Sequence, residues 1–392
     1  MRAAIRLCAG LFCAGVSLGG CTLSDSLRHD DIRSVWTQPP NTVTRQAVVF
    51  ATDRQADGSA LGYGLHWDAA IHCGVAELEV PGAFVLGQTP RWPKATLAQP
   101  PIACDVKTDM DGFAEAVAAR ARGCGRVLLF VHGYNQTFNT AILRVGQLAT
   151  DTQWHCAVAA FSWSSEGKFD RYAADIERSG YAVPELIEAL RALNAAGLKV
   201  DVVAHSMGAR VTLTALAALC NRRAVPVADE LLLVAPDVSA EHDNDDFGHL
   251  LAKGAPCVMR ATVYASDNDL ILVTSEGVHG GIPRAGRVPE RDLQYLKDGK
   301  VDIVDASAAP GDPFGHGYFV LSYEMMDDMM WVLSGLPIER RAAADALGGP
   351  TLSCATPGCG DKHYVLRVAK DRGPDTQTRL LRALWPLIFR VQ

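Results

Sequence analysis

Short apolar runs alternate with longer segments of helical periodicity along most of this chain. The clearest run is Arg126-Val127-Leu128-Leu129-Phe130-Val131, which has no polar position after its first residue. Unbroken runs of this kind are typical of parallel strands that are covered on both faces. The pattern predicts strands at 126–131, 157–162, 200–204, 231–235, 258–265 and 301–305, and helices at 113–122, 138–150, 170–196, 207–221, 246–253, 270–275 and 322–334.

This alternation predicts an α/β fold with a mostly parallel central sheet and helices on both of its faces. Two earlier strands are expected at 47–50 and 75–80, and the proline-rich stretch 83–108 is expected to be a surface loop. In such sheets ligands bind outside the carboxyl ends of the strands. We therefore expect catalytic residues directly after the apolar runs.

The N-terminus has the layout of a secretory signal. Arg2 and Arg6 precede an apolar run over 7–18, which ends in Leu18-Gly19-Gly20-Cys21. That tetrapeptide resembles the lipobox of bacterial lipoproteins, so we expect residues 1–20 to be removed, Cys21 to be acylated, and 22–44 to be a linker. The alternative is an ordinary signal peptide with a cysteine in it. Thr22 after the cysteine favours, by analogy, the outer membrane facing the periplasm.

Composition narrows the choice of partner. Of 392 residues, 48% are hydrophobic and 21% are charged, which is ordinary for a globular protein, and the net charge is −7. No long basic stretch is present, so nucleic acid is not expected as a partner. Membrane contact is expected through the N-terminal lipid anchor, because acyl chains hold a protein at a bilayer without a spanning helix.

The cysteines fit an exported protein. With Cys8, Cys13 and Cys21 set aside, eight of the eleven cysteines remain, at positions 73, 104, 124, 156, 220, 257, 354 and 359. An even number in an oxidising compartment favours disulfides. No Cys-x-x-Cys pair or nearby pair of histidines occurs, so no metal site or cofactor is expected.

Candidate chemistry begins at Ala204-His205-Ser206-Met207-Gly208, which lies between a predicted strand and an Ala/Leu-rich helix. A serine between small residues in this context is typical of a nucleophile elbow, although Ala204 replaces the usual glycine. A serine that merely caps the helix is the alternative. An oxyanion hole is expected from the backbone N–H groups of Met207 and of Tyr134, which follows Gly133 after the strand at 126–131. We expect His132 to brace that loop.

The acid and the base should follow later strands, in the order serine, acid, histidine. Asp269 is the preferred acid, with Asp267 and Asp237 as alternatives, because all three follow apolar runs. His316 is the preferred base, since it lies between two glycines after the last predicted strand. His279 is the second choice of base, because it follows the acid too closely to leave room for a helix and a strand between them.

Taken together, several short motifs resemble the DUF900 family of bacterial alpha/beta-fold hydrolases. The likeness covers about residues 45–335 and supports Ser206, Asp269 and His316 by position. It implies an α/β-hydrolase fold and brings little knowledge of the substrate. The motifs that carry it are Thr52-Asp53-Arg54, His132-Gly133-Tyr134-Asn135, Phe161-Ser162-Trp163, Ala204-His205-Ser206-Met207-Gly208, Ala235-Pro236-Asp237, Tyr264-Ala265-Ser266 with Asp269, and His316-Gly317-Tyr318.

The family topology also implies a pairing of the cysteines. Cys124 and Cys156 would precede neighbouring strands at one edge of the sheet, and Cys220 would end a helix near Cys257 at the same edge. The remaining local closures would be Cys73 with Cys104 and Cys354 with Cys359.

The sequence therefore predicts a catalytic domain over 45–335 and a C-terminal extension over 336–392. We expect its apolar stretch 379–391 to pack as a terminal helix, because the acyl anchor already supplies membrane contact; a helix on the membrane surface is the alternative. The expected activity is hydrolysis of carboxylic esters, small-molecule or lipid, in the cell envelope through an acyl-enzyme on Ser206. The alternatives are an acyltransferase with the same triad and a non-catalytic envelope lipoprotein.

Overall fold

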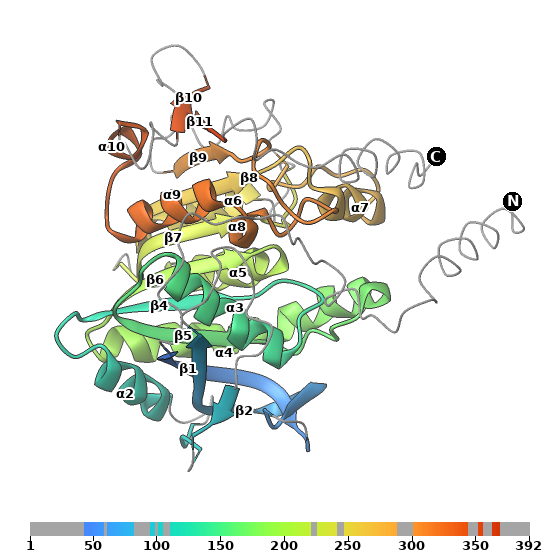
Figure 1. Cartoon of the computed structure of the whole chain (residues 1–392). Coiled ribbons are helices and arrows are strands. Elements are labelled where there is room, and N and C mark those ends of the chain that lie inside the picture. Colours follow the sequence, from blue (N-terminus) through green and yellow to red (C-terminus); the bar gives the residue numbers. More distant parts are fainter. Residues whose placement is uncertain are drawn as a thin grey trace, which may run out of the picture.

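The computed structural model of the protein describes residues 43–58, 61–81, 95–98, 101–104, 110–220, 226–240, 247–287, 301–343, 352–355 and 363–368. The predicted signal peptide 1–20, Cys21 and the helix at 379–391 lie outside these residues. Within them, one sheet of eleven strands runs through the molecule in the order β10-β11-β9-β8-β7-β6-β4-β5-β1-β2-β3 (Figure 1).

The centre of the sheet is parallel, as its apolar runs predict. The pairs β4–β5, β4–β6, β6–β7, β7–β8 and β8–β9 are all parallel, and β1 joins β5 in the same sense. The central strands are β4 (Arg126–Val131), β5 (Ala157–Ser162), β6 (Lys199–His205), β7 (Ala228–Val234), β8 (Val258–Ala265) and β9 (Val301–Asp305).

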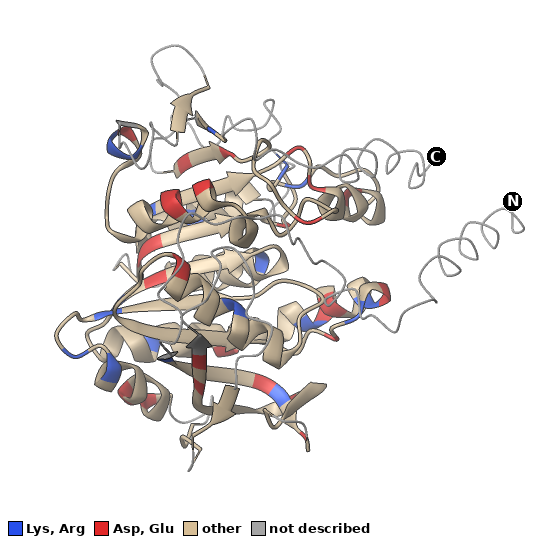
Figure 2. Cartoon of the chain, in the orientation of Figure 1, with Lys and Arg blue, Asp and Glu red and all other residues tan. Residues whose placement is uncertain are grey.

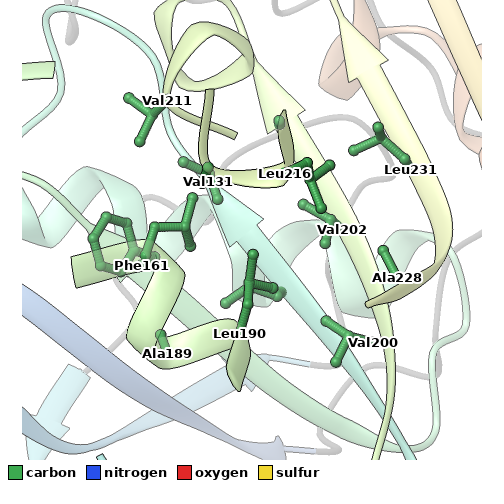
Figure 3. Packing of buried hydrophobic residues seen from close by; sticks show 14 of the residues in the cluster. Val131, Phe161, Ala189, Leu190, Val200, Val202, Val211, Leu216, Ala228 and Leu231 are labelled. Atoms are coloured by element: carbon green, nitrogen blue, oxygen red, sulfur yellow. The ribbon is translucent and has the colours of Figure 1, made fainter. Parts of the chain in front are cut away.

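Helices cover both faces of this sheet because alternate strand residues point to opposite sides. Val127, Leu129 and Val131 of β4 belong to one apolar core and Leu128 and Phe130 to the other. Figure 3 shows part of the first core, where β4 and β6 meet two helices. That core is covered by α2 (Asp111–Arg120), α4 (Tyr172–Ala195), α5 (Met207–Cys220) and α6 (Phe247–Gly254), and the second by α3 (Phe138–Asp151), α8 (Tyr318–Leu321) and α9 (Tyr323–Leu333).

The first edge of the sheet contains both strands predicted there, at 47–50 and 75–80, but the strands are longer than the sequence indicates. β1 (Val43–Ala56) and β2 (Tyr63–Pro81) form a long antiparallel hairpin, and the short β3 (Ala95–Leu97) lies in the stretch expected to be a loop. β1 begins at Val43, inside the predicted linker 22–44. The first half of β2 is half-buried or exposed, so its side chains lack the apolar run on which the prediction depended.

The C-terminal segment continues the same sheet at the other edge. β11 (His363–Leu366) pairs in parallel with β9 and in antiparallel with β10 (Leu352–Cys354). Before them, α10 (Ile338–Ala343) is held to the core by the buried guanidinium of Arg341, which donates to both carboxylate oxygens of Asp328 at 3.1 Å. Strands of three and four residues carry too little pattern to be predicted from sequence.

Charged residues are interspersed over the described helices and strand ends instead of forming one continuous basic band (Figure 2). The shorter elements that complete the described chain are η1 (Phe169–Arg171), η2 (Ala255–Cys257) and α7 (Leu270–Val278). None of the helices in the described ranges combines the length and the apolar character that a bilayer span requires.

Three of the four expected disulfides are present. Cys73 pairs with Cys104, Cys124 with Cys156, and Cys220 with Cys257, with Cα–Cα distances of 6.0, 6.1 and 5.7 Å. Cys354 is disulfide-bonded as well, whereas Cys359 lies outside the described residues. Cys124 and Cys156 precede β4 and β5, which places their bond at the amino edge of the sheet, opposite the edge where ligands are expected.

Removal of the Cys124–Cys156 bond should lower the free energy of unfolding and leave the kinetics of the folded protein unchanged. The bond spans 32 positions of the chain, and closing a loop of that size stabilises a folded protein by about 3–4 kcal/mol. We expect the Cys124→Ala/Cys156→Ala variant to unfold at lower urea concentration while its folded form keeps wild-type kinetics at low temperature. Reductant should then affect this variant less than the wild type. An unchanged unfolding midpoint would contradict the prediction.

Candidate active site

Ser206 lies in a sharp turn between β6 and α5. Its φ is 53°, in the left-handed region that side chains other than glycine rarely adopt, and such conformations cost of order 1–3 kcal/mol. Backbone hydrogen bonds hold the turn: Ser206 N–H donates to the Val234 carbonyl at 2.9 Å, and Ala209 N–H donates to the Ser206 carbonyl at 3.0 Å. A strained, well-held serine at a strand-to-helix turn is the geometry of a nucleophile elbow.

The loop after β4 lies directly against this turn. A Cβ atom on Gly133 would come within 2.7 Å of the Ser206 Cβ, so only glycine allows this approach. Tyr134 and Met207 are both buried, and among the described residues their backbone N–H groups make no hydrogen bond. Buried N–H groups without a partner are rare. Two of them beside the serine are suited to receive the negative oxygen of a reacting carbonyl.

His132 is buried within this loop. Its Nδ1 contacts the Gly133 carbonyl at 2.8 Å, its carbonyl accepts a hydrogen bond from Trp163 Nε1 at 2.7 Å, and its ring stacks on the Trp163 indole. Burial, together with the positive charge of Arg54, lowers the pKa of His132 to about 3. His132 is therefore neutral and held by the loop, as a bracing residue would be.

Asp269 and His316 are 47 positions apart in the chain and meet at the carboxyl edge of the sheet. His316 Nδ1 lies 2.7 Å from Asp269 Oδ2, and the Asp269 side chain is fully buried. Burial by itself lowers the pKa of His316, but the adjacent Asp269 carboxylate, together with the charges of Asp312 and Asp237, outweighs burial, so the pKa is raised. Asp269 also caps α7, because its Oδ1 accepts the Leu272 N–H at 3.0 Å.

His205 places this pair beside the elbow. Its ring lies 4.7 Å from the ring of His316 and 4.5 Å from that of Phe319, centroid to centroid, and it immediately precedes Ser206. Burial lowers the pKa of His205 well below its ordinary value, so the ring is neutral. In the described part of the chain Ser206 Oγ makes no hydrogen bond with His316. Such bonds are often long in unliganded enzymes and tighten when substrate binds.

The alternative acids occupy different surroundings. Asp237 is buried in a network in which it accepts hydrogen bonds from Tyr172 at 2.5 Å, Ser275 at 2.7 Å and Arg284 at 2.7 Å. Asp267 is exposed. The alternative base His279 contacts the Ser275 carbonyl through Nδ1 at 2.8 Å. No ion pair or hydrogen bond that the structure describes joins any of these three to His316.

Two buried charged side chains brace the site, and the sequence did not identify either as a site residue. The guanidinium of Arg54 donates to the carbonyls of Ser165 and Gln136 at 2.9 and 2.8 Å, and Asp175 accepts hydrogen bonds from Ser165 Oγ and from Asn135 N–H. Together they tie the loop after β4 to the loop after β5. The only available signal was the presence of Arg54 in a family-like motif.

Comparison with known proteins agrees with this architecture. The family model described as an alpha/beta hydrolase of unknown function, DUF900, matches residues 111–332, which include Ser206, Asp269 and His316. No curated protein matches the chain.

Among solved structures, the chain is similar to one of two fungal esterases from Rhizomucor miehei, with 12% identity, a TM-score of 0.36, and coverage of 77% of this chain and 87% of that one. A predicted CIB-like hydrolase from Thermoplasma acidophilum has 13% identity, a TM-score of 0.34, and coverage of 75% and 100%. Aspergillus fumigatus lipase B has 14% identity, a TM-score of 0.35, and coverage of 78% and 72%.

The family match covers more than half of the chain, from α2 to α9, and it falls on the parallel sheet and on the elbow described above. The protein thus belongs to the DUF900 family of alpha/beta hydrolases and has their fold.

Proposed function

We propose that the protein is a serine hydrolase that cleaves carboxylic esters through an acyl-enzyme on Ser206. The observation that carries this proposal is the buried contact of 2.7 Å between Asp269 and His316, at the edge of the sheet where the Ser206 turn also lies. The family assignment supports hydrolytic chemistry in general. The choice of esters, and of the serine as nucleophile, is our inference.

In the proposed reaction, Ser206 Oγ attacks the ester carbonyl carbon while His316 Nε2 takes the hydroxyl proton. Asp269 holds His316 Nδ1–H and stabilises the imidazolium that forms. The N–H groups of Tyr134 and Met207 donate to the oxyanion. His316 then protonates the departing alkoxide, and the alcohol leaves. Water then attacks the acyl-enzyme while His316 Nε2 takes its proton. His316 returns a proton to Ser206 Oγ, which releases the carboxylic acid and regenerates the serine.

The direct test is covalent capture. The wild-type protein, folded and oxidised, is incubated with a fluorophosphonate, and the modified residue is located by peptide mass spectrometry. We expect one adduct, on Ser206. Parallel assays with p-nitrophenyl esters of graded chain length would define the acyl group. A protein that neither labels nor hydrolyses any ester would refute the proposal and favour a non-catalytic role, whereas labelling at another residue would assign a different nucleophile.

We also propose that the enzyme acts in the cell envelope, held by acyl chains on Cys21. The lipobox-like tetrapeptide supports this location, as do the disulfides, because such bonds persist mainly in oxidising compartments.

Replacement of Cys21 should release the protein from the membrane. We expect full-length Cys21→Ser, expressed in a bacterium, to lose metabolic labelling by a radioactive fatty acid and to move from the membrane to the soluble fraction, because the acyl chains on Cys21 supply the proposed anchoring. Cys8→Ser, inside the predicted signal peptide, is the matched control and should stay with the membrane. Membrane retention of Cys21→Ser without label would show that another contact holds the protein.

A further inference from the structure

The loop that carries His316 is organised by one buried side chain, that of Asp312. This carboxylate accepts the N–H of Phe314 at 2.8 Å through Oδ1 and the N–H of Gly317 through Oδ2. The Gly315 N–H donates to the Asp312 carbonyl at 2.8 Å. Backbone N–H groups before and after His316 are thus attached to Asp312, which has only 6% of its surface exposed.

The same loop is attached to the segment that carries the acid. The N–H of Leu270, the residue after Asp269, donates to the Phe314 carbonyl at 2.8 Å. Phe314 therefore donates to Asp312 and accepts from the start of α7. Because the backbone near His316 is held from both sides, the position of its ring relative to Asp269 depends on the Asp312 carboxylate.

Gly317 shows how closely the carboxylate fits the loop. A Cβ atom at this position would lie 2.6 Å from Asp312 Oδ2, so a larger residue would displace the carboxylate.

The charges around His316 also indicate a role for Asp312. Several groups act on the pKa of His316: burial lowers it, while Asp269 most strongly, then Asp312 and then Asp237, raise it. The neutral His205 ring faces His316 from the elbow, and Arg144 of α3 is near enough to act on both Asp312 and His205. Asp312 is thus the second carboxylate, after Asp269, that favours the protonated form of His316.

We propose that Asp312 is a positioning residue for the reaction: its carboxylate orients His316 through the N–H groups of Phe314 and Gly317 and favours imidazolium formation. This inference rests on the proposed function, in which His316 is the base. Asp312 itself touches neither Ser206 nor, in the proposed reaction, the substrate.

The test compares Asp312→Asn with Asp305→Asn. Asparagine has nearly the same shape but no charge, and its amide group cannot accept the second N–H. Asp305, the last residue of β9, makes a similar turn in which its Oδ1 accepts the Ser307 N–H at 2.8 Å, but it does not flank His316. We expect Asp312→Asn to lower the fluorophosphonate labelling rate and kcat/KM by about 10–100-fold, since small misplacements of catalytic groups have effects of this size.

The pH dependence separates positioning from a merely structural role. Loss of the Asp312 charge should move the acidic limb of the labelling rate to lower pH, and an NMR titration of His316 should move in the same direction. Gly317→Ala should slow labelling but leave the acidic limb in place, because it displaces the carboxylate and keeps its charge. If Asp312→Asn does not fold, Gly317→Ala tests the orientation effect alone.

Two different failures can be told apart. If the wild type does not label, the proposed function fails, and the NMR titration still tests the influence of Asp312 on His316. If the wild type labels and Asp312→Asn matches Asp305→Asn in rate and pH profile, the positioning role is overturned.

Discussion

Ser206→Ala is expected to lower kcat for ester hydrolysis by about 10⁶-fold, because removal of a serine nucleophile from a comparable triad has an effect of that order. Fluorophosphonate labelling should disappear altogether, since no acyl or phosphonyl bond can form. The Ser206 turn is held by backbone hydrogen bonds, and alanine tolerates its geometry about as well as serine does, so the variant should fold.

The matched control is Ser334→Ala, which removes an exposed hydroxyl at the end of α9 and should hydrolyse esters at the wild-type rate. Persistent labelling of Ser206→Ala would assign the nucleophile to another residue. A wild-type rate in that variant would mean that the measured hydrolysis does not pass through the elbow.

Asp269→Asn is expected to lower kcat by about 10⁴-fold, which is the effect of the corresponding change in the serine protease triad. The reason is the contact of 2.7 Å with His316 Nδ1: an amide in that place can present its N–H group, which favours the wrong imidazole tautomer. Asparagine is as good a helix cap as aspartate, so the start of α7 should remain intact and the loss should be catalytic rather than structural.

The pH profile of this variant gives a second readout. His316 acts as a base only when neutral, so the rate falls as the pH drops below its pKa. Asp269 raises that pKa, which places the wild-type limb at higher pH than for a free histidine. In Asp269→Asn the remaining rate should fall at lower pH than in the wild type. Asp267→Asn, an exposed change two residues earlier, should alter neither kcat nor the pH at which the rate falls. If that pH is the same in Asp269→Asn as in the wild type, Asp269 is excluded as the partner of His316.

Local sequence was enough to predict the centre of the fold. The strands β4 to β9 lie between two layers of helices, so most of their side chains are apolar and the pattern is strong. The edges could not be predicted as well. The first half of β2 is half exposed, and β10 and β11 are too short to show a period. Their pairing depends on neighbours that are distant in the chain.

In the candidate site, too, local sequence predicts one part and only the tertiary structure shows the other. The elbow at Ser206 is a local structure, because a strand, small residues and a helix follow one another within a few positions, and the sequence by itself points to it. Only the tertiary structure shows that Asp269, and neither Asp237 nor Asp267, contacts His316, and that Arg54, Asp175 and Asp312 hold the surrounding loops. The physical reason is that a buried charge is stable only beside its partners, and those partners come from segments that folding alone brings together.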